Sequence, residues 1–215
     1  GHLEEATAAV KERGHAVVAE MKSTIFEVAW RTRSLEQLFF DHIDRPEIAA
    51  YLLDNITERK AFMAGRFAEA GADLIQFGDD IATQRGPMMS MTMWREWYKP
   101  RLARVIQAAK DANPSVLAMY HSDGLYEPFM DDLIEIGIDV LSPIEPECMD
   151  PEALKETFGD RVAFWGAVGT QTTMPLGSVD EVREIARQRI RTVDSGGGLV
   201  VAPTHVLEPE VPVDN

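Results

Sequence analysis

Short apolar segments that alternate with longer amphipathic segments most limit the fold of this chain. The expected strands begin near residues 15, 73, 116, 138, 162 and 198. The expected helices cover residues 3–13, 46–70, 92–111, 126–136, 151–158 and 179–193. Strands that alternate with helices are typical of right-handed βαβ units and a parallel sheet. The sequence therefore predicts an α/β fold, and six strands fit either an open doubly wound sheet or six-eighths of a barrel.

The composition is that of an ordinary globular protein, with 45% apolar and 27% charged residues in 215. A formal net charge of −15 argues against binding to nucleic acid or to an anionic membrane surface. No apolar run is long enough for a transmembrane helix. Cys148 is the only cysteine, so an internal disulfide and a cysteine-rich zinc cage are excluded, and a reducing, cytoplasmic compartment is expected.

The usual nucleotide-binding motifs are absent from the sequence. No Gly-x-Gly-x-x-Gly follows an expected strand, and there is no Walker sequence. The run Gly196–Gly198 precedes its strand, which is the wrong side for a phosphate cradle and is typical of a turn. The sequence therefore gives no support to a nucleotide site.

Polar side chains gather where the expected strands end. In a parallel sheet these carboxyl ends all face one side, where sites are usually built. Such a gathering of carboxylates and imidazoles indicates metal binding or proton transfer. The residues concerned are Glu20, Asp79, Asp80, His121, Asp123, Glu145, Glu147, Gln171 and His205.

One apolar run, Val116–Tyr120, is followed by His121 and Asp123, two residues apart. In extended backbone they project to the same side. Together with His205 they have the donor types of a divalent metal site, with zinc the first candidate and one position left open for chemistry. The pair also fits a proton-transfer unit, in which the carboxylate orients the imidazole. Simple capping of the loop is the third alternative, and the spacing alone does not separate the three.

Asp79 and Asp80 form a second candidate pair at a strand end. One carboxylate could contact substrate while the other caps the following turn. Met88 begins a methionine cluster that fits either an apolar ligand or ordinary packing. We expect Asp80, Met88, Glu145 and Gln171 to contact substrate.

Several segments together resemble the uroporphyrinogen decarboxylase superfamily, from about residue 15 to residue 215. The ordered set is more specific than any of its pieces. The segments are Gly71-Ala72-Asp73-x3-Phe77-Gly78-Asp79, Tyr120-His121-Ser122-Asp123-Gly124, Gly137-Ile138-Asp139-Val140-Leu141, Phe164-Trp165-Gly166 and Ala202-Pro203-Thr204-His205-x3-Pro209-x2-Pro212.

The resemblance implies a (β/α)8 TIM barrel, of which this chain holds about six strands. Residues 1–215 would then be a single barrel domain that lacks the first strand–helix units and the last helix, so we expect a fragment. The superfamily includes the decarboxylase of porphyrin biosynthesis and zinc-dependent methyltransferases that serve corrinoid proteins.

The resemblance also assigns residues. Asp79 matches an aspartate of the decarboxylase, and His205 matches its Gly-His-Gly histidine. The methyltransferases place His-x-Cys at 121–123 and a second cysteine at 205, and these three hold zinc. Asp123 and His205 stand here in place of the two thiolates, and both can bind zinc or a harder metal. The expected catalytic residues are Asp79, His121 and His205, and the expected metal ligands are His121, Asp123 and His205.

These features predict a metal-dependent methyltransferase, working on a small molecule and with a corrinoid protein as partner. Its metal would act as a Lewis acid on a methoxy, thiol or amine group. The first alternative is a metal-free decarboxylase of a tetrapyrrole or smaller carboxylate, in which Asp79 stabilises a protonated intermediate. The second is an inactive fragment that only binds.

Overall fold

The computed structural model describes residues 1–215, and its centre is a six-stranded sheet in which all neighbouring strands are parallel. The strands are β1 (Val18–Lys22), β2 (Leu74–Gly78), β5 (Leu117–His121), β6 (Val140–Ile144), β7 (Ala163–Val168) and β8 (Leu199–Pro203). All six predicted strands are confirmed. The first begins later than expected, so Glu20 lies inside β1 and the strand ends at Lys22.

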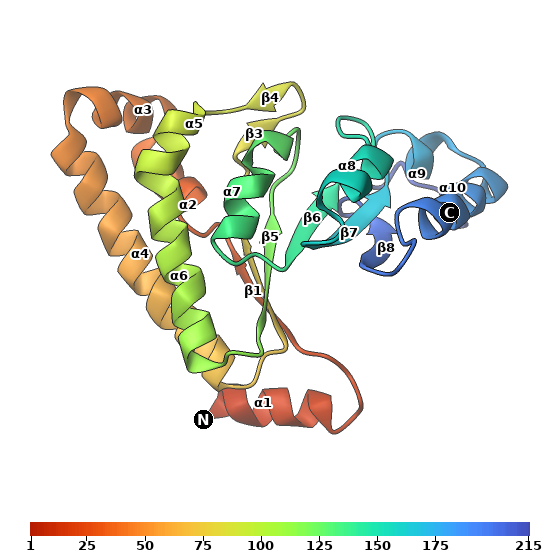
Figure 1. Ribbon diagram of the computed structural model, residues 1–215, viewed down its shortest axis with the longest axis horizontal. Coiled ribbons are helices and arrows are strands. Elements are labelled where there is room, and N and C mark those ends of the chain that lie inside the picture. Colours follow the sequence, from red (N-terminus) through yellow and green to blue (C-terminus); the bar gives the residue numbers. More distant parts are fainter.

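The order of the strands in the sheet decides between the two predicted architectures. It runs β1-β2-β5-β6-β7-β8, so each long strand pairs with the next one along the chain. A doubly wound sheet would reverse this order at a switch point, and no reversal occurs. Sequential parallel pairing is the winding of a β/α barrel, and here it forms an open arc with β1 and β8 as its edge strands. Figure 1 shows β5, β6, β7 and β8 following one another from left to right.

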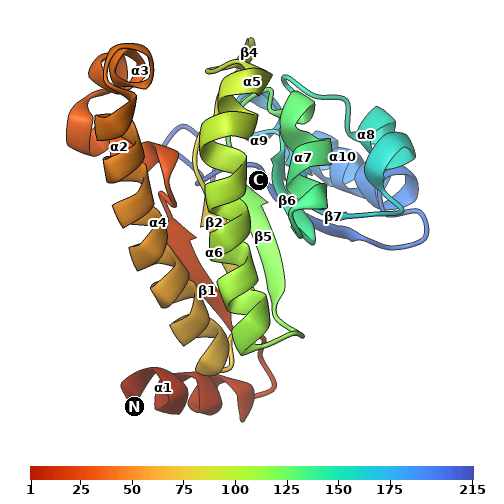
Figure 2. The same cartoon turned by 60° about the vertical axis from the view of Figure 1, so that its left-hand side comes forward.

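Helices cover the outer side of this arc. The two longest, α4 (Pro46–Glu69) and α6 (Lys99–Ala112), lie side by side over the β1–β2–β5 part of the sheet in both ribbon views (Figure 2). None of the helices is long and apolar enough to cross a membrane. The remaining helices are α1 (His2–Lys11), α2 (Phe26–Arg33), α3 (Leu35–Asp44), α7 (Met130–Glu135), α8 (Pro151–Phe158), α9 (Thr173–Leu176) and α10 (Val179–Thr192).

The main hydrophobic core lies between the sheet and these helices. Side chains on alternate strand positions point outward into it, including Phe77, Tyr120 and Phe164, each fully buried. The opposite set, with Leu74 and Met119, forms only a small cluster on the concave inner side. The inner side is therefore free to line a cavity.

The predicted helix over residues 92–111 is interrupted. A short helix α5 (Met91–Met93) passes into a π-helical turn η1 (Trp94–Tyr98) before α6 begins. Pro100 lies in the first turn of α6. Proline has no N–H to donate to the preceding turn, so a regular α-helix cannot run through this position unchanged.

The helix predicted over 126–136 is confirmed, and it begins with a 3-10 turn η2 (Glu127–Phe129) that leads into α7. A hairpin of β3 (Ala82–Thr83) and β4 (Gly86–Pro87) was not indicated by the sequence.

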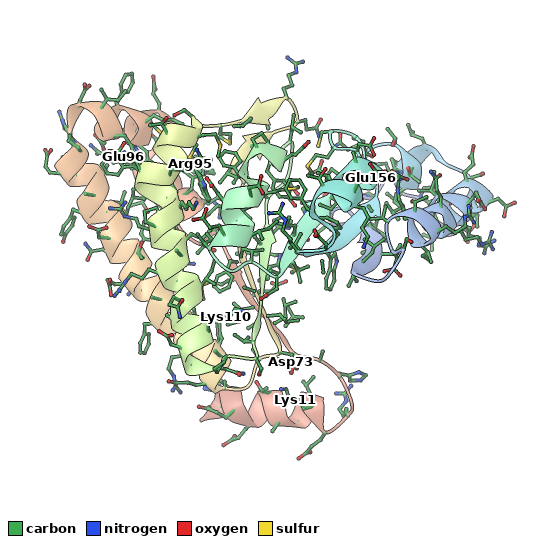
Figure 3. The ribbon with its side chains drawn as sticks, in the orientation of Figure 1. Lys11, Asp73, Arg95, Glu96, Lys110 and Glu156 are labelled. Carbon is green, nitrogen blue, oxygen red and sulfur yellow. The ribbon has the colours of Figure 1, made fainter.

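The amino ends of the strands are tied together by ion pairs. Lys11 of α1 lies 2.8 Å from Asp73, and the two side chains meet below the sheet in Figure 3. The other oxygen of Asp73 accepts the N–H of Val17. On the next strands, Lys110 lies 2.5 Å from Asp139, which also accepts the N–H of Ala118. This end of the sheet is structural, and the chemistry-bearing groups lie at the other end.

Candidate active site

A cavity of about 570 Å³ opens on the concave side of the sheet, at the carboxyl ends of the strands. Its lower wall is made by inward-facing strand residues, among them Gln76, Met119 and Trp165. Its upper part is lined by the loops that follow β2, β5 and β8, which contribute Asp80, Asp123 and His205. The structure therefore brings Asp80, His121, Asp123 and His205 of the predicted cluster to one place.

Asp123 lies between the two histidines. Its Oδ1 is 3.5 Å from Nε2 of His121, and its Oδ2 is 3.6 Å from Nε2 of His205. His121 is the last residue of β5 and Asp123 follows two residues later, so both project into the cavity. His205 reaches the same carboxylate from the loop after β8.

Asp80 completes a compact group of ligand types. Its Oδ1 accepts the N–H of Asp123 at 2.9 Å. One ligand atom each from Asp80, His121 and Asp123 lies within 4.8 Å of the others. The most compact set thus contains Asp80, which we expected to contact substrate. His205, which we expected to be a ligand, is outside this set but lies against Asp123.

The electrostatics of this group suit a cation. Burial lowers the pKa of His121, which favours the neutral imidazole that binds metals. Burial, and then the neighbouring charge of Asp80, raise the pKa of Asp123 to about 6, while His205 opposes the shift. Oδ1 of Asp123 is buried and has no hydrogen-bond partner. A buried carboxylate oxygen left free beside a neutral imidazole fits a divalent metal ligand, so the donor set present here fits the implied metal.

Asp79 points the other way. Its carboxylate is 4% exposed and accepts the backbone N–H groups of Ile25 and Glu27, each at 2.9 Å. Burial raises its pKa to about 7, although these hydrogen bonds oppose the shift. It lines neither this cavity nor the adjoining one described below, because successive residues after a strand alternate in direction. The predicted catalytic position of Asp79 is therefore corrected: Asp80 faces the cavity, and Asp79 caps α2.

A second cavity, also of about 570 Å³, adjoins the first and shares Asp80, Asp123 and His205 with it. Glu145 and Gln171 line it as part of its wall. Oε1 of Glu145 accepts the N–H of Gly124 at 2.8 Å, which fixes the loop that carries Asp123.

Met88 does not belong to this wall. It lines neither cavity and instead packs against the main hydrophobic core. The structure thus does not bring Met88 to the polar cluster, and its contact with substrate stays a prediction. A methionine beside a strand-end loop has the same local sequence whether it faces a ligand or the core.

The sequence analysis missed one wall of the first cavity, which is formed around the loop between β1 and α2. Lys22 ends β1, Ser23 lies in the loop, and Glu27 and Arg31 lie in α2. This wall was missed because the first strand was expected to end before Lys22. Had that strand been extended to Lys22, the residues after it would have been grouped with those that follow the other strands.

A sequentially wound parallel sheet with its polar cluster at the carboxyl ends of the strands defines the class of β/α-barrel proteins. Within this class, residues 25–215 match the model of the family described as Uroporphyrinogen decarboxylase (URO-D). The chain belongs to this family, and the resemblance drawn from the sequence motifs is confirmed.

Known relatives point in the same direction. Methylcobamide:CoM methyltransferase MtaA of Methanosarcina barkeri is 26% identical over 173 residues, which is 80% of this chain and 48% of that protein. The chain thus spans about half the length of the curated relatives it matches. A solved methyltransferase from Methanosarcina mazei superposes with a TM-score of 0.78 at 25% identity, over 99% of this chain and 60% of that one.

A more distant solved structure shares the fold alone. A dihydropteroate synthase from Anaplasma phagocytophilum matches with a TM-score of 0.53 at 16% identity, over 89% of this chain and 68% of that one.

Proposed function

We propose that this protein is a metal-dependent methyltransferase of the URO-D family. The observation that carries the proposal is the compact set of Asp80, His121 and Asp123, with the free Oδ1 of Asp123, at the mouth of the cavity. The similarity to a methylcobamide methyltransferase supports methyl transfer as the reaction. His205 stands against Asp123 and is the candidate fourth member of the site.

The donor set favours a harder metal environment than a thiolate site. The only thiol of the chain, Cys148, lines neither cavity, and burial raises its pKa to about 12. Oxygen and nitrogen ligands remain, which suit zinc as well as harder divalent ions. A divalent metal held there would supply Lewis-acid polarisation of a methoxy, thiol or amine group.

The residues of the chain have distinct tasks in this proposal. Asp123 stands between the two imidazoles, with one oxygen toward His121 and the other toward His205, so it can share a metal with either histidine. His205 is half-exposed and lies where the two cavities meet, so as the fourth member of the site it faces an incoming substrate.

The two cavities suit a reaction with two partners. They meet at Asp80, Asp123 and His205, so a methyl donor and a methyl acceptor could reach the cluster from different sides. A corrinoid protein is the proposed donor or acceptor, because the relative acts on a methylcobamide. The acidic character of the molecule fits neither nucleic acid nor an anionic membrane as a partner.

The metal-free decarboxylase is the weaker candidate on this geometry. It would need the carboxylate of Asp79 in contact with the substrate, yet that group is buried beneath the start of α2. The family description includes a decarboxylase, but the curated relatives with a named reaction are methyltransferases.

Metal analysis of the full chain tests the proposal. We expect about one zinc or comparable divalent ion per chain, and at least a tenfold loss of affinity in Asp123→Asn and in His121→Ala, since each loses a ligand. The matched control is Asp180→Asn, whose side chain is 97% exposed and remote from the cavity. Unchanged affinity in both site variants would contradict the metal site.

Methyl transfer is measured separately. The loaded protein is mixed with methylcobalamin and a thiol, or with a methoxy compound and reduced cobalamin, and methylated product is followed. Activity that persists after chelation and in Asp123→Asn would contradict the proposed role of the metal. Absence of transfer together with absence of bound metal would contradict the proposed function as a whole.

A further inference from the structure

The end of β1, the loop after it and residues of α2 form a charged wall of the first cavity. Lys22, Ser23 and Glu27 line it together with Arg31. The carboxylate of Glu27 accepts hydrogen bonds from Arg31 at 2.6 Å and from Ser23 Oγ at 3.1 Å. The wall is thus a preformed network of donors and acceptors, and a molecule in the cavity would meet it.

The residues of this loop do not stabilise its backbone conformation by themselves. Ser23 adopts a left-handed conformation with φ 56°, which an L-residue other than glycine rarely takes. The residue before α2 is Ile25, which has no side-chain acceptor for the free N–H groups of the first turn. The loop therefore depends on partners from elsewhere in the fold.

Asp79 supplies the missing cap from the neighbouring strand. Its two oxygens accept the N–H of Ile25 at 3.1 and 2.9 Å, and Oδ1 also accepts the N–H of Glu27 at 2.9 Å. These contacts join positions 52 to 54 residues apart in sequence. A carboxylate at the start of a helix is also favoured by the helix dipole.

Two further contacts fix the preceding residues. Nζ of Lys60, from α4, donates to the carbonyl of Ser23 at 2.7 Å. Thr24 donates its N–H to the carbonyl of Gly78, and its Oγ1 accepts the N–H of Gly78, both at 2.9 Å. Three consecutive residues, Ser23 to Ile25, are thus held by groups from α4 and the end of β2.

We propose that Asp79 and Lys60 are positioning residues. They touch no substrate, but they hold the β1–α2 loop and thereby the charged wall that selects the substrate. Because Asp79 precedes Asp80 in the chain, the residues after β2 connect this wall to the proposed metal ligands. That the wall faces a substrate rests on the proposed function, whereas the anchoring of the loop does not.

Amide hydrogen exchange of the full chain tests the anchoring. Asp79→Asn replaces one acceptor oxygen by a donor aimed at backbone N–H groups, and Lys60→Met removes the contact to Ser23. We expect exchange at residues 24–28 to accelerate by about tenfold or more in each variant, with α6 unchanged. Asp80→Asn is the matched control, and it should weaken metal binding without accelerating this exchange. Unchanged exchange in both test variants would overturn the proposal.

Steady-state kinetics test the selecting role, with methylcobalamin and coenzyme M as the probes. In Asp79→Asn and Lys60→Met the KM for the thiol is expected to rise about tenfold, while kcat stays within about threefold and bound metal is unchanged. A hundredfold loss of kcat at constant KM and unaltered exchange would instead make Asp79 a catalytic residue. Faster exchange with an unchanged KM would refute the selecting role.

The proposed function and the proposed anchoring of the loop can be contradicted independently of each other. If the wild-type protein binds metal but transfers no methyl group from these probes, the proposed function is contradicted while exchange still decides the anchoring. Should Asp79→Asn not fold, Lys60→Met carries the test, because Lys60 lies half-buried at the surface of α4 and contributes only one of the contacts.

Discussion

At the scale of single residues, the direction of a side chain decides its role in this protein. Asp79 and Asp80 are neighbours of identical chemistry, yet one caps a helix and the other faces the cavity. The gathering of acids and imidazoles at the strand ends could be predicted from the sequence. Which of the two acids faces inward could not, because it depends on α2 packing over the end of β2.

The close approach of β2 and β5 gives a first prediction. A Cβ on Gly78 would lie 2.6 Å from the carbonyl oxygen of His121 and 2.9 Å from its Cβ. Gly78→Ala should therefore displace the end of β5, destabilise the fold by about 1–3 kcal/mol and weaken metal binding without removing a ligand. Urea unfolding and metal titration measure the two effects. Gly65→Ala is the control, since its Cβ meets only ordinary contact at 3.6 Å and alanine favours a helix interior.

His42 gives a prediction on pH. It is buried, with Nδ1 2.6 Å from the carbonyl of Leu38 and Nε2 3.0 Å from the hydroxyl of Tyr98. Burial lowers its pKa in the folded state, so the unfolded chain takes up its proton first as the pH falls. The contribution of His42 to stability is complete above about pH 6.5 and is lost from there down to the lowered folded pKa. The difference in unfolding free energy between wild type and His42→Gln should thus shrink from pH 7.5 to pH 5, and a constant difference would contradict this.

At the scale of elements, local signals worked where a helix or strand carries its own boundaries. The predicted helix over residues 46–70 is confirmed as Pro46–Glu69, with proline in its first turn. The helix predicted over 92–111 is confirmed in extent as α5, η1 and α6, but its apolar stripe did not indicate the π-helical turn within it.

The capping box of α10 gives a prediction at this scale. Ser178 Oγ accepts the N–H of Glu181, and the carboxylate of Glu181 accepts the N–H of Ser178 at 2.7 Å. Ser178→Ala should lower the free energy of unfolding by about 1 kcal/mol, and Ser178→Gly by only a few tenths. Urea denaturation distinguishes these values. Equal stability of all three proteins would show that the box contributes nothing.

At the scale of the whole molecule, the sheet is an arc whose edge strands β1 and β8 each lack a second neighbour. Each edge strand exposes an apolar side chain, Val18 of β1 at 43% and Val200 of β8 at 46%. The prediction that residues 1–215 are part of a larger barrel domain stays a prediction. It agrees with relatives about twice the length of the matched segment.

The open edges give a prediction on association. Unpaired strands with exposed apolar side chains pair readily with other chains, so these 215 residues alone should self-associate as their concentration rises. Val200→Lys, on the edge strand β8, should reduce this association, whereas Val213→Lys, exposed outside any strand, should not. Light scattering after size-exclusion chromatography measures it. A concentration-independent monomer would contradict the expectation.

The sequence by itself determined the α/β class, the six strands, the family and the residue types at the strand ends. These depend on local periodicity and on motifs that lie within one segment. Only the tertiary structure decided that the strands are wound in sequential order, that Asp80 joins His121 and Asp123, and that Met88 belongs to the core. Each of these depends on which side of the sheet a residue faces and which segment packs over it, and contacts between residues distant in the chain settle that.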